Sequence, residues 1–222
     1  MLPKYEQKIQ NIQNMIAVLM EQVVEANEIA LDAYTRHDNS GYNAVKTVLK
    51  SIDAEANAID NEIIKTFALF GPEAQELRML VAYLKLTNEL LRIADGSKKY
   101  ARRMQEHCEG ECALKMFDDI VIKLHKTMLN AMTYILECFR NPGDCNVEEL
   151  YRKIMVEESK NDDLFSILEK EIMVQIMGEQ ELSVEYVQVL GTLRRLERGC
   201  DRAVNIANLL LYAAKGGEMR VY

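Results

Sequence analysis

The 222-residue chain has no tryptophan, only three prolines and only ten glycines. Residues that interrupt helices are therefore scarce, while leucine, alanine, glutamate, lysine, methionine and isoleucine are abundant, and this composition favours helix over sheet throughout. No segment approaches the roughly 18 uncharged apolar residues of a membrane span, and the amino-terminal segment MLPKYEQKIQ has no apolar stretch of the signal-peptide type. We expect a soluble, cytoplasmic, all-α protein.

Cysteine is also sparse, with five residues that follow no regular spacing. Such an odd and scattered set does not suit a disulfide framework, so the sequence predicts reduced thiols. The one cluster, HCEGEC at residues 107–112, resembles part of a zinc site, but it lacks a second matching pair of ligands and is more typical of a connector. The cysteines are Cys108, Cys112, Cys138, Cys145 and Cys200.

Motifs of the common catalytic sites are missing from the sequence. It has no glycine-rich phosphate loop of the Walker type and no nucleophile with a marked base. A ferritin-like di-iron oxidase would need Glu-x-x-His motifs, and no histidine follows a glutamate at that spacing. We therefore expect no enzymatic activity and no catalytic residues. The histidines, for which surface or packing roles are expected, are His37, His107 and His125.

The formal net charge of −8 argues against a nucleic-acid-binding protein, because such proteins usually carry a basic face that displaces phosphate counterions. An acidic balance suits a protein that binds cations. One basic cluster is present, and we interpret it as a solvated helix face. It consists of Lys98, Lys99, Arg102 and Arg103.

Turn-forming segments divide the chain into six long periodic stretches, each predicted as a helix. The breaks repeat along the chain, and Asp38 and Asp144 within them are 106 residues apart. This repeat predicts two copies of a three-helix unit, residues 1–108 and 112–222, packed side by side as two three-helix bundles. The breaks lie at residues 36–41, 70–73, 107–112, 141–146 and 177–181.

Apolar seams are visible in the last two expected helices, for which Asn146 and Ser183 are candidate N-caps. In the final helix the apolar spacing alternates between four and three residues, as on the buried stripe of a bundle. This stripe is Val189, Leu193, Leu196, Cys200, Ala203, Ala207 and Leu210. In the preceding helix the expected stripe is Tyr151, Met155, Phe165, Leu168, Ile172 and Ile176, with Glu158 and Asp162 in the two steps between Met155 and Phe165.

Two pairs of carboxylates stand four residues apart, Glu158 with Asp162 and Glu197 with Asp201, so each pair shares one helix face and its members repel. A turn near Gln180 would bring the two pairs to similar heights. Four carboxylates at a partly apolar groove are unfavourable unless a cation neutralises them, and oxygen ligands suit iron, manganese, magnesium or calcium. The alternative is a solvated face in which the acids pair with arginines of the last helix, which are Arg194, Arg195, Arg198 and Arg202.

These motifs resemble the PhoU family of phosphate-signalling proteins over essentially the whole chain. The second copy carries ESKND at 158–162 and ERGCD at 197–201, which are similar to the Glu/Asp-x-x-x-Asp motifs that the family places on adjacent helices. The segment RAVNIANLLLYAAKGGE that follows resembles the family's helix end. The first copy carries GPEAQELRMLVAYLKLTNELLRIAD, similar to the family's proline, Leu-Arg and acid-ending pattern.

The resemblance implies a non-catalytic cytoplasmic regulator that represses phosphate uptake and the phosphate-starvation response. Its implied partners are a membrane histidine kinase and the ATPase subunit of a phosphate ABC transporter, which would recruit it to the inner face of the membrane without insertion. The resemblance also implies a metal ion (iron, zinc or manganese) at Glu158, Asp162, Glu197 and Asp201. The alternative is a metal-free helical scaffold or adaptor, and a homodimer stays open.

The first copy departs from the family pattern. Its corresponding motifs read Asp53-x-x-x-Asn57 and Leu91-x-x-x-Asp95, so two of the four carboxylates are missing. Lys99 follows Asp95 by four residues, a spacing that suits a helix salt bridge. We predict that this half neutralises its remaining charge and that Asp53 and Asp95 bind metal weakly or not at all.

Overall fold

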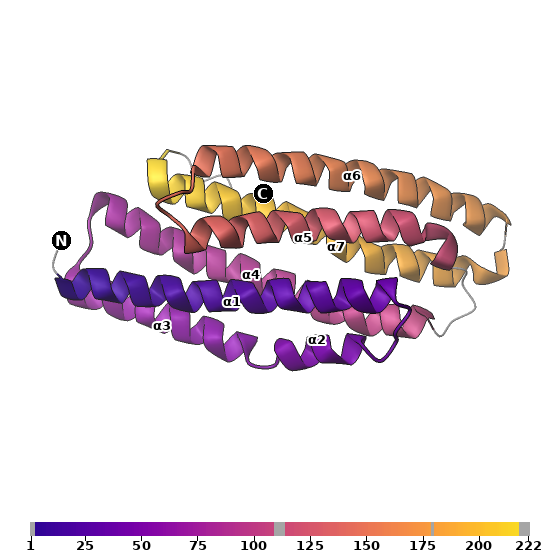
Figure 1. The fold of residues 1–222 in the computed structure, drawn as a ribbon, viewed down its shortest axis with the longest axis horizontal. Coiled ribbons are helices and arrows are strands. Elements are labelled where there is room, and N and C mark those ends of the chain that lie inside the picture. Colours follow the sequence, from indigo (N-terminus) through magenta and orange to yellow (C-terminus); the bar gives the residue numbers. More distant parts are fainter. Residues whose placement is uncertain (1–2, 109–113, 179, 218–222) are drawn as a thin grey trace.

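The computed structural model describes residues 3–108, 114–178 and 180–217 (Figure 1). Within these ranges all regular structure is helical, which confirms the all-α prediction. The α-helices are α1 (Pro3–Thr35), α2 (Tyr42–Val48), α3 (Ile52–Phe70), α4 (Ala74–Cys108), α5 (Asp118–Arg140), α6 (Val147–Gly178) and α7 (Ser183–Lys215). Two short 3₁₀ helices, η1 (Leu114–Phe117) and η2 (Gln180–Leu182), precede α5 and α7.

The long helices run roughly along the long axis of the molecule, with α1 to α4 in one half and α5 to α7 in the other (Figure 1). Helix α1 packs on α2, α3 and α4, while α5 packs on α6 and α7. The two halves meet where α4 lies along α7 and α1 lies along α5. The buried apolar side chains form one continuous core across both halves, so the predicted pair of bundles shares a single interior.

The second expected helix is interrupted between α2 and α3, and the prediction of one unbroken helix there is wrong. Leu49 and Ile52, on either side of the break, are both fully buried. The three- and four-residue spacing of buried side chains nevertheless continues across the break, so α2 and α3 present one apolar face to the core. Ser51 begins the next segment, and its hydroxyl donates a hydrogen bond to the carboxylate of Glu55 at 2.6 Å.

The starts of α6 and α7 differ in how their free N–H groups are satisfied. Asn146 Oδ1 accepts hydrogen bonds from the backbone N–H groups of Glu148 and Glu149 at 3.0 and 3.2 Å, so Asn146 is the expected N-cap of α6. Ser183 is not a cap, because its hydroxyl donates instead to the carbonyl of Gln180. The 3₁₀ turn before α7 brings that carbonyl within reach.

Cys138 and Cys145 form a disulfide with their Cα atoms 5.0 Å apart, so the prediction of reduced thiols is wrong for this pair. The turn that joins α5 to α6 folds back and brings together cysteines seven positions apart, which their sequence spacing did not indicate. Cys200 is a buried free thiol on the core stripe, as expected. The HCEGEC cluster, predicted to be a connector, lies from Cys108 onward outside the side chains that the structure describes. Its first residue, His107, has Nε2 2.9 Å from Thr192 Oγ1.

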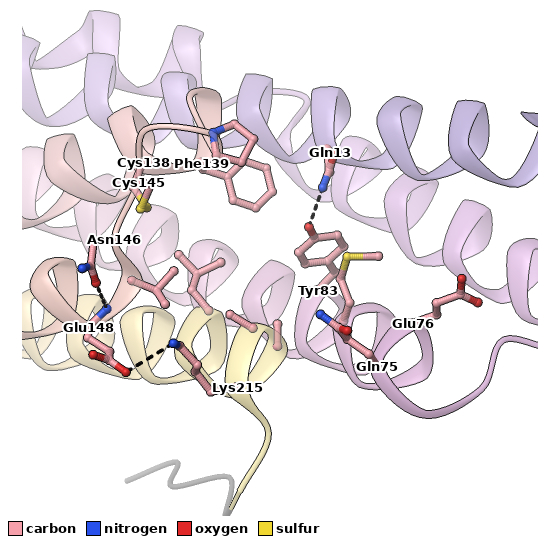
Figure 2. A pocket seen from close by; sticks show the side chains of 16 residues that line it. Gln13, Gln75, Glu76, Tyr83, Cys138, Phe139, Cys145, Asn146, Glu148 and Lys215 are labelled. Atoms are coloured by element: carbon pink, nitrogen blue, oxygen red, sulfur yellow. Dashed lines mark hydrogen bonds and ion pairs between the residues drawn. A yellow bond between two sulfur atoms is a disulfide. The ribbon is translucent and has the colours of Figure 1, made fainter. Parts of the chain in front are cut away.

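The disulfide lines a cavity of about 780 Å³ between the ends of α4, α5, α6 and α7 (Figure 2). Its wall is largely apolar and aromatic, with Phe139 and Tyr83 in edge-to-face contact. Gln13 donates a hydrogen bond to the Tyr83 hydroxyl at 2.8 Å. No helix in the described ranges is long and apolar enough to cross a membrane.

Candidate metal centre

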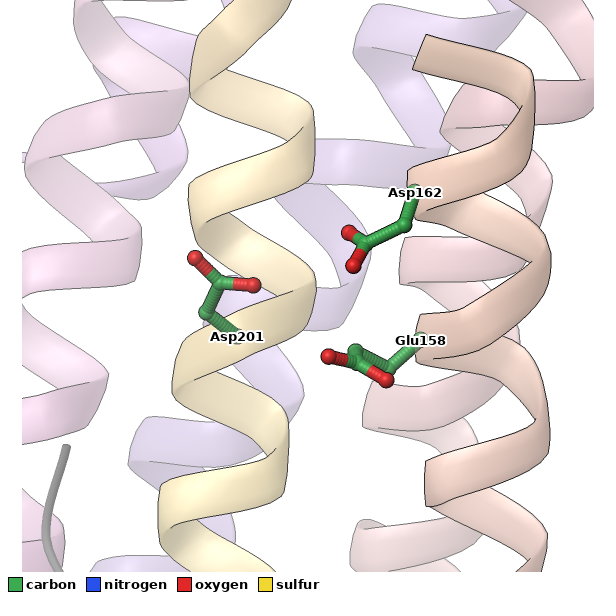
Figure 3. Close-up of side chains that lie close together, drawn as sticks. All are labelled: Glu158, Asp162 and Asp201. Atoms are coloured by element: carbon green, nitrogen blue, oxygen red, sulfur yellow. The ribbon is translucent and has the colours of Figure 1, made fainter. Parts of the chain in front are cut away.

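Three of the four predicted metal ligands converge between α6 and α7. Glu158 and Asp162 on α6 point toward Asp201 on α7 (Figure 3). One carboxylate oxygen from each of the three residues lies within 4.8 Å of the other two. We call Glu158, Asp162 and Asp201 the carboxylate triad. The expectation that the turn near Gln180 brings the two pairs to similar heights is confirmed for these residues.

Glu197 does not belong to the triad, although sequence spacing predicted four converging ligands. It lies one helical turn before Asp201, close enough that burial, Asp201 and Asp162 together raise the pKa of Glu197. Its Oε2 atom is shielded from solvent and has no hydrogen-bond partner in the described part of the chain. Glu197 therefore presents an unsatisfied carboxylate oxygen beside the triad.

The buried stripe of α6 is displaced by one residue from the predicted one in its first half. Glu157 and Asn161 occupy the two seam positions, whereas Glu158 and Asp162 lie at the seam edge, and the prediction that these two interrupt the apolar face is wrong. Their edge position leaves both carboxylates accessible from solvent. The buried residues of α6 are Leu150, Ile154, Glu157, Asn161, Phe165, Leu168 and Ile172.

Glu157 and Asn161 are site residues that sequence reasoning missed. Glu157 accepts hydrogen bonds from Lys160 Nζ at 2.6 Å and from Asn130 Nδ2 at 3.3 Å. Asn161 donates to Thr127 Oγ1 at 2.6 Å and to a backbone carbonyl of α5 at 2.9 Å. These bonds fix the rotation of α6 against α5 and so direct Glu158 and Asp162 toward α7. The sequence signal that could have found them is the apolar spacing that passes through Ile154. The adjacent Met155 is also apolar and led the predicted stripe to the wrong positions.

The triad holds its negative charge at a free-energy penalty. Burial raises the pKa of Glu158, and the carboxylates of Asp162 and Asp201 raise it further. Burial also raises the pKa of Asp201, with Asp162 adding to the effect. Burial and the neighbouring Asp163 raise the pKa of Asp162. A bound cation would offset this mutual repulsion.

The arginines of α7 do not neutralise these acids by direct contact, so the alternative in which the acids pair with these arginines is wrong. Arg202 pairs with Glu89 of α4 at 2.9 Å. Arg194 pairs with Glu169 at 3.1 Å. Among the residues that the structure describes, neither the triad nor Glu197 forms an ion pair. The remaining influence is through space, since Arg198 and Arg202 lower the pKa of Asp201.

The corresponding acids of the first half are neutralised by a lysine. Lys98 Nζ lies 3.4 Å from Asp53 and 3.8 Å from Asp95, so Lys98 is the partner of both and the prediction of Lys99 is wrong. Both carboxylates are exposed, at 69% and 57% of their side-chain surface. Absence of metal at Asp53 and Asp95 stays a prediction.

The donor set of the second half fits a metal ion of the oxygen-preferring class. Three carboxylates converge, and Glu197, within electrostatic range of Asp201 and Asp162, has an oxygen without a hydrogen-bond partner among the described residues. Cys200 is adjacent in sequence, but burial and the surrounding acids raise the pKa of its thiol far above the usual range, so it stays a protonated core residue. Oxygen donors without sulfur or imidazole suit iron, manganese, magnesium or calcium better than zinc.

Comparison with known proteins gives a consistent result. The PhoU domain model matches residues 16–104 and again residues 121–210. A phosphate-specific transport system accessory protein PhoU homolog of Xylella fastidiosa (strain 9a5c) is 24% identical over 97% of this chain and 88% of its own length. The phosphate-specific transport system accessory protein PhoU of Escherichia coli (strain K12) is 24% identical over 85% of this chain and 77% of its own length.

Two solved structures share the fold. PhoU from Pseudomonas aeruginosa superposes with a TM-score of 0.78 at 22% identity, covering 96% of this chain and all of its own. The phosphate transport system regulatory protein PhoU from Streptococcus pneumoniae superposes with a TM-score of 0.79 at 20% identity, covering 98% of this chain and all of its own. With two matched domains that together span most of its residues, this chain belongs to the PhoU family.

Proposed function

We propose that this protein is a non-catalytic, cytoplasmic negative regulator of phosphate uptake and of the phosphate-starvation response. Support comes from its two PhoU domains and from relatives named as accessory proteins of the phosphate-specific transport system. Its proposed partners are a membrane histidine kinase and the ATPase subunit of a phosphate ABC transporter. These partners would recruit it to the inner face of the membrane.

A metal ion, iron or manganese in preference to zinc, on the second half is part of this proposal. Glu158, Asp162 and Asp201 would hold it, with Glu197 alongside, and the single observation that carries the assignment is the convergence of three unpaired carboxylates. When bound, the ion would supply positive charge that cancels their repulsion and ties α6 to α7. Its affinity would fall as the pH drops, because protons compete for the same oxygens.

The α6–α7 hairpin offers a surface for a protein partner. Val174 and Met177 near the end of α6 are 58% and 74% exposed, and Val184 and Val187 near the start of α7 are 68% and 55% exposed. Large apolar side chains that gather on one exposed end of a molecule often mark an interaction site. The carboxylate triad lies farther along the same two helices, so a cation there would stiffen the hairpin that presents this surface.

The test is genetic complementation with a reporter of the phosphate-starvation response. Deletion of the gene should raise reporter expression in phosphate-replete medium, and the wild-type gene should restore repression. A Glu158→Gln/Asp162→Asn/Asp201→Asn variant should fail to restore it. The matched control is Asp163→Asn/Glu171→Gln/Glu181→Gln, which removes three exposed acids of the same region and should restore repression.

The outcomes separate this function from the alternative of a metal-free scaffold. Full repression by the triad variant would support the scaffold and remove the metal from the proposal. An unchanged reporter after deletion would contradict the regulatory function itself. Co-purification of the chain with the kinase or the ATPase subunit, lost in a Val184→Asp/Val187→Asp variant, would assign the partner surface to the hairpin.

A further inference from the structure

A groove between α4 and α7 gathers positive charge in a protein whose net charge is −8. It lies on the side of α7 that faces α4, whereas the carboxylate triad faces α6. Five of its lining side chains are cationic and one is acidic. They are Arg92, Asp95 and Lys99 of α4 and Arg195, Arg198 and Arg202 of α7.

Most of these cations have no counter-charge among the residues that the structure describes. Arg202 pairs with Glu89, and the single acid, Asp95, pairs with Lys98 outside the groove. The other four cations form no hydrogen bond or ion pair with any residue in the described ranges. They are Arg92, Lys99, Arg195 and Arg198.

Arg195 is the most constrained member of this group. Its Nε atom is shielded from solvent and has no hydrogen-bond partner among the described residues. Burial and the guanidinium groups of Arg198, Arg103 and Arg102 lower the pKa of Arg195, so Arg195 lies within electrostatic range of three other arginines. A guanidinium whose Nε atom is shielded and unpartnered, and which lies among like charges, is unfavourable unless an anion satisfies it.

The size of the groove restricts the anion. Its volume is about 220 Å³, below the roughly 300–1,000 Å³ of sites for drug-sized ligands. A helix about 10–12 Å across would not enter it. Gly96 lines the groove, and a Cβ placed there would meet no other heavy atom within 4 Å, so the space beside its backbone is open.

We propose that this groove binds a small multivalent oxyanion of the phosphate class, held by Arg92, Lys99, Arg195 and Arg198. Guanidinium forks match the oxygens of a tetrahedral oxyanion, and several converging cations favour a doubly charged ion over a monocarboxylate. A phosphate carried on a protein would offer the same oxygens, and the experiment below distinguishes it from the free ion. This site needs neither a metal nor a protein partner and is therefore independent of the proposed function.

The proposal is tested by titrating purified, chelator-treated protein with inorganic phosphate, sulfate or acetate at low ionic strength and following the heat of binding. Chelation removes any metal through which phosphate could bind at the triad. We expect saturable 1:1 binding of phosphate and sulfate, with acetate at least tenfold weaker. Arg92→Gln/Arg195→Gln should raise the Kd for phosphate at least tenfold.

Two further variants make the test specific. Lys46→Gln/Lys123→Gln removes the same net charge from exposed positions elsewhere and should change the Kd less than twofold. Gly96→Leu keeps every charge but fills the groove, so it should also raise the Kd at least tenfold while circular dichroism reports an intact fold. Should the arginine variant unfold, Gly96→Leu alone decides the question.

Three results would overturn the proposal. They are the absence of saturable phosphate binding to folded wild-type protein, equal weakening by the groove and control variants, and phosphate binding that Gly96→Leu leaves unchanged. In the first case, binding of a phosphorylated peptide would reassign the groove to a protein-borne phosphate.

Discussion

Replacement of Asp162 by asparagine should stabilise the metal-free protein, although Asp162 is a candidate functional residue. An oxygen of Asp162 lies within 4.8 Å of oxygens of both Glu158 and Asp201. Two like charges at that distance repel by about 1 kcal/mol in a water-like dielectric. Two such pairs give about 2 kcal/mol, and the exposure of Asp162 together with salt screening reduces this to about 1 kcal/mol. Asparagine removes the charge while preserving size.

The assay is urea-induced unfolding of chelator-treated protein, followed by circular dichroism. The free energy of unfolding should rise by about 1 kcal/mol, which in a thermal melt would raise Tm by roughly 2–4 °C for a chain of this size. Glu171→Gln, which changes an exposed acid farther along α6 and outside the triad, is the matched control and should change stability by less than about 0.5 kcal/mol. With saturating Mn²⁺ the wild type should become more stable than Asp162→Asn, because it gains more free energy from binding the ion. A less stable Asp162→Asn protein without metal would refute the electrostatic reasoning.

Three other predictions concern the core, the disulfide and the contact between halves. Burial lowers the pKa of His125 from 6.5 to about 3, so its contribution to stability is complete above pH 6.5 and falls by about 1.4 kcal/mol per pH unit below it. Between pH 7.5 and pH 5, urea unfolding should show that His125→Leu loses less stability than the wild type, and equal losses would contradict this. A Cys138→Ser/Cys145→Ser variant should lose about 2.5 kcal/mol from the entropy of the short loop, and unchanged urea stability would contradict it. Arg202→Gln should lower the free energy of unfolding by about 2 kcal/mol, because Glu89, at 8% exposure, loses its partner. Adding Glu89→Gln should recover most of the stability to urea, and no recovery would refute the pairing.

Helix α7 shows what periodicity alone could establish. All seven residues of its predicted stripe are buried, because the spacing of four and three continues without a polar residue. In α6 the same reasoning placed the stripe one residue late over its first half. Ile154 and Met155 are both apolar, so either could belong to the stripe. The buried positions that follow are Glu157 and Asn161. Because both are polar, an analysis of apolar spacing predicts that they are exposed. Their burial depends on hydrogen-bond partners on α5, which one helix's sequence does not show.

The charged contacts of the first half show a second limit of sequence reasoning. The i,i+4 rule for an isolated helix favours Lys99 as the partner of Asp95. The structure uses Lys98, because Asp53 on α3 lies across from it and one ammonium group can then contact both carboxylates. The Cys138–Cys145 disulfide is a similar case, since it depends on the path of the turn between α5 and α6.

The most direct measurement is the metal content of protein purified without chelators or affinity-tag metals. Elemental analysis of the wild type should find stoichiometric iron, manganese or zinc, which Glu158→Gln/Asp201→Asn should lose and Asp163→Asn should retain. Circular dichroism confirms that each variant is folded. Metal-free wild-type protein that also binds no added Mn²⁺, or equal metal in all three proteins, would contradict a metal centre at the carboxylate triad.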